Sequence, residues 1–278
     1  MSKQTMRLVV AGAAGRMGRM LIRQIVETDG LGLHAALVRP GSPWLGQDAG
    51  TLAGLAPAGV PASDDVAAAL AGADCILDFS TPAAAARLAA APGRCSVAHV
   101  IGTTGFTPEQ ERRLARAAQA TALVVSGNMS PSVILLGFLA GQAARALPAA
   151  DWDIEILEMH HKHKVDAPSG TALLLGEAAA RGRGQDLRTQ AVLAREGQTG
   201  ARRAGAIGFA TLRGGSVVGE HTVLFAGDGE TLALSHSASD RLGFVRGALQ
   251  AAHWTRGRPP GRYSMLDVLG LPQAPAGG

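Results

Sequence analysis

The strongest constraint on the fold is a glycine-rich turn near the start of the chain, Gly12-Ala-Ala-Gly-Arg-Met-Gly18. It follows an apolar run from Arg7 to Ala11 that predicts a strand, and it leads into a pattern from Met17 to Glu27 that predicts a helix. Glycines between a strand and a helix allow a tight turn and let backbone N–H groups approach a pyrophosphate. The turn therefore predicts a dinucleotide-binding unit. Its glycine spacing of three and three differs from the commonest fingerprint, and a turn needed only for helix–sheet packing is the alternative.

Strand and helix patterns continue to alternate through the first half of the chain. Further strands are predicted at Leu33 to Val38, Cys75 to Phe79, Val97 to Ile101 and Leu123 to Ser126. Helices are predicted at Asp64 to Leu70 with Ser63 as N-cap, from Pro82 after Thr81, and at Pro108 to Ala120 after Thr107. Such alternation indicates a parallel sheet with helices on both faces.

The pattern changes after Asn128. A long apolar helix is predicted at Pro131 to Ala146, a strand at Asp153 to His160, a helix from Ser169 to about Ala180, β-rich chain from Ala206 to Ser237, and a last helix at Arg241 to Trp254. We expect an α/β protein in which a Rossmann-type, doubly wound parallel sheet domain is followed by an α+β domain with a mixed or antiparallel sheet. The first domain is assigned to residues 1–130, with 241–278 returning to it, and the second to 131–240. The tail from Leu271 is expected to be frayed.

Composition narrows the class of protein. Hydrophobic residues make up 47% of the 278 and charged residues 17%, which is typical of a globular chain. The net charge is +4, but the arginines are scattered and no run of five basic residues occurs, which argues against nucleic-acid binding. The longest apolar run, near Val133 to Ala140, is too short to cross a bilayer, and no secretory leader is recognisable. Cys75 and Cys95 form no Cys-x-x-Cys motif. We expect a cytoplasmic protein with reduced cysteines.

The end of the second predicted strand bears on the choice of cofactor. An acidic residue there usually binds the ribose diol of the dinucleotide, but this chain has Val38 and Arg39. Because arginine can pair with a 2′-phosphate, we expect NADPH to be used, with or without NADH; an ordinary surface arginine is the alternative. Two further loops, Gly102 to Thr104 and Ser126 to Met129, follow predicted strands and are candidates to contact the nicotinamide and its ribose. Each loop taken alone is also compatible with a simple turn.

A second constellation reads Glu158-Met-His-His-Lys-His-Lys-Val-Asp-Ala-Pro-Ser-Gly-Thr-Ala172. All five residues from His160 to Lys164 can carry positive charge, and in an extended segment His160 and Lys164 point to the same side. The helix start at Ser169 would offer the N–H groups of Gly170 and Thr171 to a carboxylate. These features predict a small, multiply anionic substrate and proton transfer by histidine or lysine. A zinc site, for which no second ligand cluster is found, and a solvated basic strand end are the alternatives.

Several segments of the chain, taken together, resemble a known family. The segments VAGAAGRMGR, IGTTGF, SGNMS, EMHHKHKVDAPSGTAL and IGFATLRGGSVVGEHTVLF occur in the order found in 4-hydroxy-tetrahydrodipicolinate reductases, long called dihydrodipicolinate reductases, of bacterial lysine and diaminopimelate synthesis. The resemblance covers nearly the whole chain. It implies hydride transfer from NADPH or NADH to a cyclic dicarboxylate, which yields tetrahydrodipicolinate after loss of water. It also implies a homotetramer with a dinucleotide domain and a substrate-binding and tetramerisation domain.

The resemblance also implies roles for individual residues. His160 is expected to be the general acid/base, Lys164 the proton donor, and His161, Gly170 and Thr171 the substrate-binding residues. The cofactor is expected to contact Gly12, Ala13, Ala14, Gly15, Arg16, Met17, Arg39, Gly102, Thr103, Thr104, Ser126, Gly127, Asn128 and Met129, and no metal is implied. Many relatives have an acidic residue where this chain has Val38, which again favours NADPH. Two alternatives remain: a reductase of the same fold acting on another small anionic substrate, and a non-catalytic NADPH-sensing regulator. A regulator would be expected to have lost His160 or Lys164.

Overall fold

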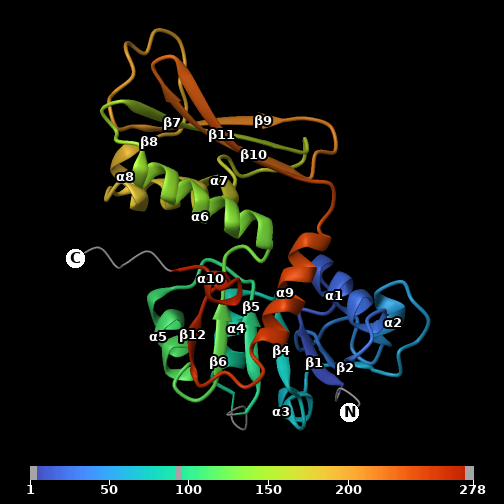
Figure 1. Ribbon diagram of the computed structural model, residues 1–278. Helices are drawn as coiled ribbons and strands as arrows, with labels where there is room; N and C mark the ends of the chain where they lie inside the picture. Colours follow the sequence, from blue (N-terminus) through green and yellow to red (C-terminus); the bar gives the residue numbers. More distant parts are fainter. Residues whose placement is uncertain (1–4, 92–95, 273–278) are drawn as a thin grey trace. The chain divides into compact units, whose positions relative to one another are not determined.

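The computed structural model describes residues 5–91 and 96–272, which form two compact units (Figure 1). The first unit contains Met1–Ser130 and Phe244–Gly270, and the second contains Pro131–Gly243. Each unit has its own sheet and its own hydrophobic core. The tail beyond residue 272 and Cys95 lie outside the described residues, and Cys75 is buried.

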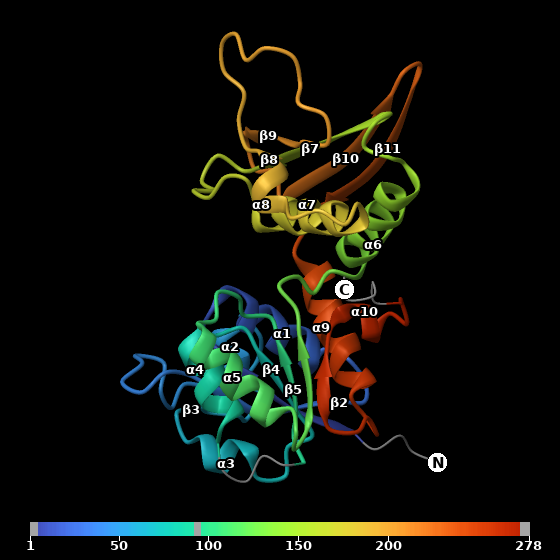
Figure 2. The same ribbon diagram turned by 90° about the vertical axis from the view of Figure 1, so that its left-hand side faces the viewer.

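The sheet of the first unit has seven strands, all parallel, in the order β12-β6-β5-β4-β1-β2-β3. Its strands are β1 (Met6–Ala11), β2 (Leu31–Leu37), β3 (Ala62–Ser63), β4 (Cys75–Asp78), β5 (Ala98–Ile101), β6 (Ala122–Val125) and β12 (Gly261–Tyr263). Its helices, which cover both faces (Figures 1 and 2), are α1 (Arg16–Val26), α2 (Ala49–Leu52), α3 (Val66–Leu70), α4 (Pro82–Ala89), α5 (Pro108–Ala117), α9 (Leu242–Trp254) and α10 (Met265–Val268). The predicted doubly wound sheet is confirmed.

Burial on both faces explains why these strands are largely apolar. Every residue of β4 and of β5 is buried, since helices cover each side of the sheet and no face meets water. The predicted caps at Thr81 and Thr107 are confirmed, because their side chains accept hydrogen bonds from Ala84 and Gln110 N–H. The cap predicted at Ser63 is wrong, because the side chain of Asp65 accepts from the Ala68 N–H at the start of α3 instead.

The glycine-rich turn joins β1 to α1 and depends on two of its glycines. Gly12 has φ +77°, a conformation that only glycine adopts at little cost. Gly18 lies inside α1, where a Cβ atom would overlap the carbonyl oxygen of Gly12. Gly15, the N-cap of α1, has no side chain that could accept hydrogen bonds from the first amides of the helix. The turn is therefore tight, close-packed and open at the positive end of a helix.

The second unit is built on a five-stranded sheet in the order β11-β10-β7-β9-β8. Its strands are β7 (Trp152–His160), β8 (Ala191–Val192), β9 (Ile207–Arg213), β10 (Gly219–Gly227) and β11 (Glu230–Ala238). Its helices are α6 (Pro131–Ala146), α7 (Gly170–Gly182) and α8 (Leu187–Gln190). β10 runs antiparallel to β7 and β11, whereas β7, β9 and β8 are parallel, so the sheet is mixed as predicted.

One face of this sheet packs on α6 and α7, and in the described residues no helix lies on the other (Figures 1 and 2). The core between sheet and helices contains Ile154 and Ile156 of β7, Phe209 of β9 and Phe225 of β10, and burial of each such side chain contributes about 2 kcal/mol. A Cβ at Gly182 would overlap the Gly141 carbonyl oxygen, so α6 and α7 approach closely through glycine.

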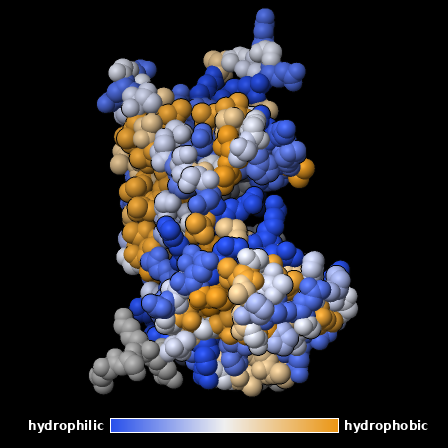
Figure 3. Space-filling view, turned by 90° about the vertical axis from the view of Figure 1, so that its right-hand side faces the viewer, coloured by the Kyte–Doolittle hydropathy of each residue, from blue (hydrophilic) through white to orange (hydrophobic). Residues whose placement is uncertain are grey.

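Hydrophobic side chains are not confined to the two cores. Figure 3 shows patches of hydrophobic residues on the surface, interrupted by hydrophilic ones. In the second unit, large apolar residues that are partly exposed include Leu135 and Leu139 of α6, Leu157 of β7 and Leu212 of β9. No helix of the part of the chain that the structure describes is long and apolar enough to cross a membrane.

Candidate active site

Strand β7 carries the start of the histidine-rich segment, and its alternation decides where those side chains point. Successive residues of a strand face opposite sides of the sheet, so Ile154, Ile156, Glu158 and His160 lie on one face. The first two are core residues beneath the helices. The apolar stripe thus ends in a carboxylate and an imidazole, still on the helix-covered side of the sheet.

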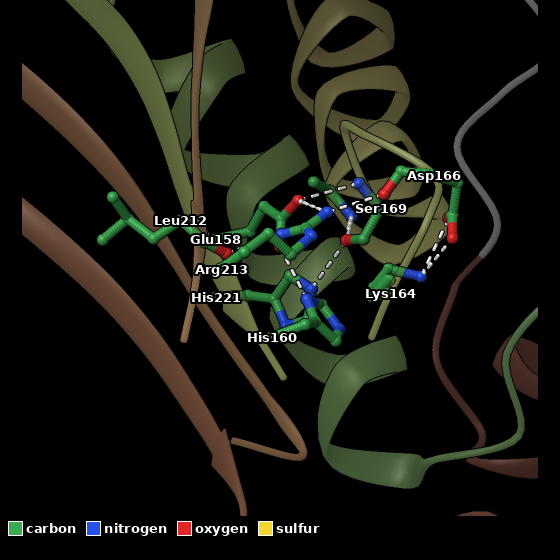
Figure 4. A network of polar contacts seen from close by, with 9 residues as sticks. Glu158, His160, Lys164, Asp166, Ser169, Leu212, Arg213 and His221 are labelled. Atoms are coloured by element: carbon green, nitrogen blue, oxygen red, sulfur yellow. Dashed lines mark hydrogen bonds and ion pairs between the residues drawn. The ribbon is translucent and has the colours of Figure 1, made fainter. Parts of the chain in front are cut away.

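Glu158 is the centre of the polar network in Figure 4, with a side chain only 1% exposed. Its Oε2 lies 2.6 Å from Nδ1 of His160 and accepts from Nη1 of Arg213 at 2.9 Å. Its Oε1 accepts from Nη2 of Arg213 at 2.9 Å and from the backbone N–H of Ser169 at 3.0 Å. One carboxylate thus joins the end of β7, the end of β9 and the start of α7.

These donors keep the carboxylate ionised although it is buried. Burial by itself raises the pKa of Glu158, but the hydrogen bonds from Arg213, His160 and the Ser169 amide outweigh it and hold the pKa below its ordinary value. An ionised carboxylate carries no proton and can only accept hydrogen bonds. Nδ1 of His160 is therefore the donor in the contact between the two residues.

His221 of β10 lies beside His160, with ring centroids 5.1 Å apart in an edge-to-face arrangement. Its Nε2 is 3.0 Å from the hydroxyl of Ser169. Burial, together with a smaller effect of the neighbouring His160, lowers the pKa of His221 to about 4. The His221 ring is consequently neutral near pH 7, a polar but uncharged wall beside His160.

The expectation that His160 and Lys164 share one side of an extended strand is wrong. β7 ends at His160, and the chain then turns, with the Lys164 N–H donating to the carbonyl of His161 at 3.1 Å. The Lys164 ammonium lies 2.8 Å from both carboxylate oxygens of Asp166, toward which it points in Figure 4. That contact lowers the pKa of Asp166. Two backbone hydrogen bonds join this segment to the chain after β9: the Gly214 N–H donates to the His160 carbonyl, and the Lys162 N–H donates to the Gly215 carbonyl.

Helix α7 begins directly beside this network. The predicted cap at Ser169 is confirmed, since its hydroxyl accepts from the Ala172 N–H at 3.1 Å. Gly170, the first helical residue, is exposed, and a Cβ atom there would meet open space. The positive end of the helix therefore faces accessible space one residue beyond the amide that binds Glu158. This arrangement suits a carboxylate ligand.

His161 lies close to the same charges. Burial lowers its pKa, and the positive charges of Arg241 and His163 lower it further. Its Nδ1 is buried without a hydrogen-bond partner in the described structure. A polar atom in that condition is suited to an anionic or polar ligand that supplies the missing contact.

The zinc alternative can be tested on the donor atoms. Among the described residues, Glu158, His160 and His221 have ligand-type atoms within 4.8 Å of one another. One nitrogen of each histidine and both carboxylate oxygens already form hydrogen bonds: Nδ1 of His160 with Glu158, Nε2 of His221 with Ser169, and both oxygens of Glu158 with Arg213. A guanidinium at 2.9 Å opposes a second cation at the same carboxylate. The group fits a hydrogen-bonded network better than a metal shell.

The residues predicted to contact a dinucleotide are brought together in the first unit. Gly12 to Met17 follow β1, Arg39 follows β2, Gly102 to Thr104 follow β5, and Ser126 to Met129 follow β6. All of these loops lie at the carboxyl edge of one sheet, whose strand order reverses between β1 and β4. Ligands of open α/β sheets bind at this edge and near this reversal.

Local contacts in these loops fit a bound dinucleotide. The hydroxyl of Thr103 is buried and has no hydrogen-bond partner in the described residues. The Ser126 hydroxyl donates to the carbonyl of Asn128 at 2.6 Å, and the Asn128 side chain accepts from the Ser130 N–H at 2.8 Å. The loop after β6 is thus held by its own side chains, while that after β5 leaves a polar atom for a ligand.

Sequence reasoning missed four members of the network around His160, namely Glu158, Ser169 as a partner of Glu158, Arg213 and His221. Glu158 had a detectable signal, because the alternation of β7 places a carboxylate on the buried face. Arg213 and His221 come from β9 and β10, more than 50 residues along the chain from Glu158 and Ser169. Their position depends on strand register, which a single sequence does not reveal.

The shifted pKa of His221 predicts how stability depends on pH. The unfolded chain binds a proton at this residue near pH 6.5, whereas the folded protein does so only near pH 4, so protonation favours unfolding as the pH falls between these values. The free energy of unfolding falls by on the order of 3 kcal/mol over this pH range. Urea unfolding from pH 7.5 to 4 is expected to show a shallower loss of stability in His221→Asn than in the parent. The exposed-site control His163→Asn should keep the parent's pH dependence; equal slopes in all three proteins would contradict the assignment.

Comparison with protein families matches both units of the chain. Residues 6–129 match the model for the N-terminus of dihydrodipicolinate reductase, and residues 132–269 match the model for its C-terminus. The boundary between the two matches lies where the chain first passes from one unit to the other, at Ser130 and Pro131, and the C-terminal match continues into the segment from Phe244 that returns to the first unit.

Whole-chain relatives agree with these matches. A protein of Rhizobium rhizogenes named 4-hydroxy-tetrahydrodipicolinate reductase is 61% identical over 98% of this chain and 99% of its own length. A protein of Rhizobium meliloti with the same name is 60% identical over 98% of this chain and 100% of its own. A dipicolinate-bound dihydrodipicolinate reductase from Paenisporosarcina sp. TG-14 has the same fold, with a TM-score of 0.75, 24% identity and coverage of 95% of this chain and 99% of that one. This chain is a member of the dihydrodipicolinate reductase family.

Proposed function

We propose that this protein reduces 4-hydroxy-tetrahydrodipicolinate with NADPH or NADH, in the synthesis of lysine and diaminopimelate. The reaction consumes the substrate, one NAD(P)H and one proton, and it yields tetrahydrodipicolinate, NAD(P)⁺ and water. The observation that carries the proposal is the pairing of His160 with the buried Glu158 beside the N-terminus of α7, in a chain whose two halves both match the family. Dependence on a cytoplasmic pool of NAD(P)H would place the enzyme in the cytoplasm.

The residues of the second unit have distinct parts in this proposal. The first amides of α7, at Gly170 and Thr171, and the ring of His161 bind the substrate carboxylates. His160 exchanges a proton with the reacting ring, and Lys164 donates one. Holding the dicarboxylate by both ends fixes the ring against rotation and so lowers the entropy cost of the reaction.

The first unit binds the cofactor through the glycine turn and the loops after β5 and β6. When bound, the nicotinamide cofactor supplies the hydride. The uncapped N-terminus of α1 binds the pyrophosphate through its backbone amides. The unpartnered hydroxyl of Thr103 forms a hydrogen bond with the nicotinamide ribose or carboxamide.

The role assignment predicts the effect of two alanine variants. His160→Ala and Lys164→Ala are each expected to lower kcat by about 100-fold or more, because each removes a proton-transfer group. NADPH oxidation followed at 340 nm, with substrate generated in the assay, measures the effect. The neighbouring exposed residue gives a matched control, His163→Ala, which should retain the parent kcat. Near-normal kcat in both site variants would refute the roles. If the parent protein does not reduce the expected substrate, a panel of other cyclic and open-chain dicarboxylates distinguishes a reductase of different specificity from an inactive NADPH sensor.

The absence of an acidic residue at the end of β2 predicts a preference for NADPH. Val38 has its backbone fixed by a bond from its N–H to the Ser63 carbonyl, and the exposed Arg39 follows it. An arginine–phosphate contact is a charge-assisted hydrogen bond that contributes about 1.5–3 kcal/mol. Arg39→Ala is therefore expected to lower kcat/KM for NADPH by about tenfold or more and to change that for NADH little. NADH serves as the internal control; a parent enzyme that strongly prefers NADH would overturn the assignment.

We further propose that the protein assembles as a homotetramer through the uncovered face of its second sheet. Leu157 of β7 and Leu212 of β9 project from that face, and Leu212 points away from the His160 network in Figure 4. Strand pairing puts Met159 directly beside Leu212, and Leu224 of β10 directly beside Ala233 of β11. An exposed apolar sheet face of this kind is typical of a subunit interface.

Sedimentation velocity tests the assembly. The parent protein is expected to sediment at four times the subunit mass, and Leu212→Glu to give smaller species because it places a charge in the interface. Val26→Glu, which changes a partly exposed apolar residue of α1, is the control and should leave the mass unchanged. A monomeric parent would contradict the assembly, and a tetrameric Leu212→Glu would contradict the proposed face.

A further inference from the structure

Burial of Glu158 costs hydration free energy, and a gain in the stability of the fold does not by itself account for a carboxylate at this position. A carboxylate removed from water loses several kcal/mol of hydration, and buried ion pairs often stabilise a fold no more than apolar residues of similar size. Yet Glu158 occupies a position that would otherwise continue the apolar stripe of Ile154 and Ile156. All of its hydrogen bonds go to groups that surround the start of α7 and the ring of His160.

The contact with Glu158 determines which nitrogen of His160 exchanges a proton. Because the carboxylate can only accept, the neutral imidazole keeps its hydrogen on Nδ1, and Nε2 carries the lone pair. Nε2 faces Gly219 of β10, where a Cβ atom would lie 3.1 Å from it. The glycine thus leaves room around the nitrogen that remains available.

The charges around His160 come from four elements. Glu158 of β7 is the negative group, Arg213 of β9 is the positive group that shares it, and the neutral His221 of β10 packs against the ring edge. In the turn that follows β7, the positive charge of Lys164 is balanced by Asp166. Glu158 is thus the one carboxylate in direct contact with the ring among the described residues.

We propose that Glu158 is a positioning residue of this enzyme, which fixes the Nδ1–H tautomer and the orientation of His160 and, through the Ser169 amide, holds the start of α7 in register with that ring. The proposal rests on the function proposed above and deepens it. Glu158 then positions both Nε2 of His160, which exchanges the proton, and the N-terminus of α7, which binds the substrate carboxylate. The competing explanation is that Glu158 serves only as the partner of Arg213, a structural ion pair without influence on His160.

The tautomer can be observed without any assay of activity. In protein labelled with ¹⁵N at histidine, the long-range ¹⁵N–¹H spectrum of His160, assigned with His160→Gln, is expected to show Nδ1 protonated and Nε2 unprotonated at a pH at which the ring is neutral. A parent protein with the hydrogen on Nε2 would overturn the proposal. This outcome is independent of whether the protein reduces the expected substrate.

The variant Glu158→Gln keeps the size of the side chain and removes its charge. We expect His160 to become a mixture of the two tautomers, and kcat to fall about 10- to 100-fold with a small change in KM, the range seen when an outer partner of a functional histidine is lost. The pH at which kcat/KM falls on the alkaline side should decrease, since the protonated ring loses its negative neighbour. Glu158→Asp, which retains the charge but shortens the reach, should preserve that pH more closely than Glu158→Gln and provides a second variant if the glutamine protein folds poorly.

Arg213→Lys is the matched structural control. It breaks the two-pronged contact with Glu158 but retains a positive charge and leaves the contact between Glu158 and His160. Both variants are expected to lower Tm, but only Glu158→Gln should alter the His160 tautomer and the pH profile. If Glu158→Gln lowers Tm while the tautomer and the pH profile stay as in the parent, the residue is only the partner of Arg213 and the proposal is wrong.

Discussion

The second unit depends on one buried carboxylate. Glu158 receives hydrogen bonds from an imidazole, a guanidinium and a backbone amide, and these three donors belong to separate parts of the chain. Without the carboxylate, the end of β9 and the start of α7 would lose the side chain that binds both, and the guanidinium of Arg213 would lose its carboxylate partner while still donating to the carbonyls of Leu212 and Asp166. Removal of one partner from such a group costs more free energy than the group contributes in net stability, so each member depends on the others.

Each unit presents the N-terminus of a helix that is suited to an anion, and the two helix ends are kept accessible in different ways. In the first, the glycine turn leaves the N-terminus of α1 without a side-chain cap, so the amides themselves are available. In the second, Ser169 caps α7 at its third amide, and the helix end stays accessible at Gly170. One helix end is suited to a pyrophosphate and the other to a small carboxylate, which is the pair of ligands that a dinucleotide-dependent reductase of a dicarboxylate requires.

Much of this architecture was predictable from the sequence. The Gly12 to Gly18 turn and the alternation of strands and helices predicted the parallel sheet, and the apolar pattern of Pro131 to Ala146 matched α6 residue for residue. Short elements such as β3, α2 and β12 were not predicted, because two to four residues carry no periodic signal. The local structure of the site was predicted correctly where its residues are consecutive, as in the cap at Ser169. It was predicted wrongly where the backbone changes direction, as before Lys164. Arg213 and His221 needed the register of β9 and β10, which only the folded sheet provides.

The alternation of β7 has a consequence for how the chain tolerates change. Leu157 and Met159 face the uncovered side of the sheet, while Glu158 and His160, each one peptide bond away, face the helices. A single inserted or deleted residue upstream in this strand would exchange the two sets, placing the acid and the imidazole on the uncovered face and two apolar side chains among polar groups. A substitution in β7 changes one side chain, whereas an insertion changes the face of every residue that follows it, so the length of the strand is fixed by the site at its end.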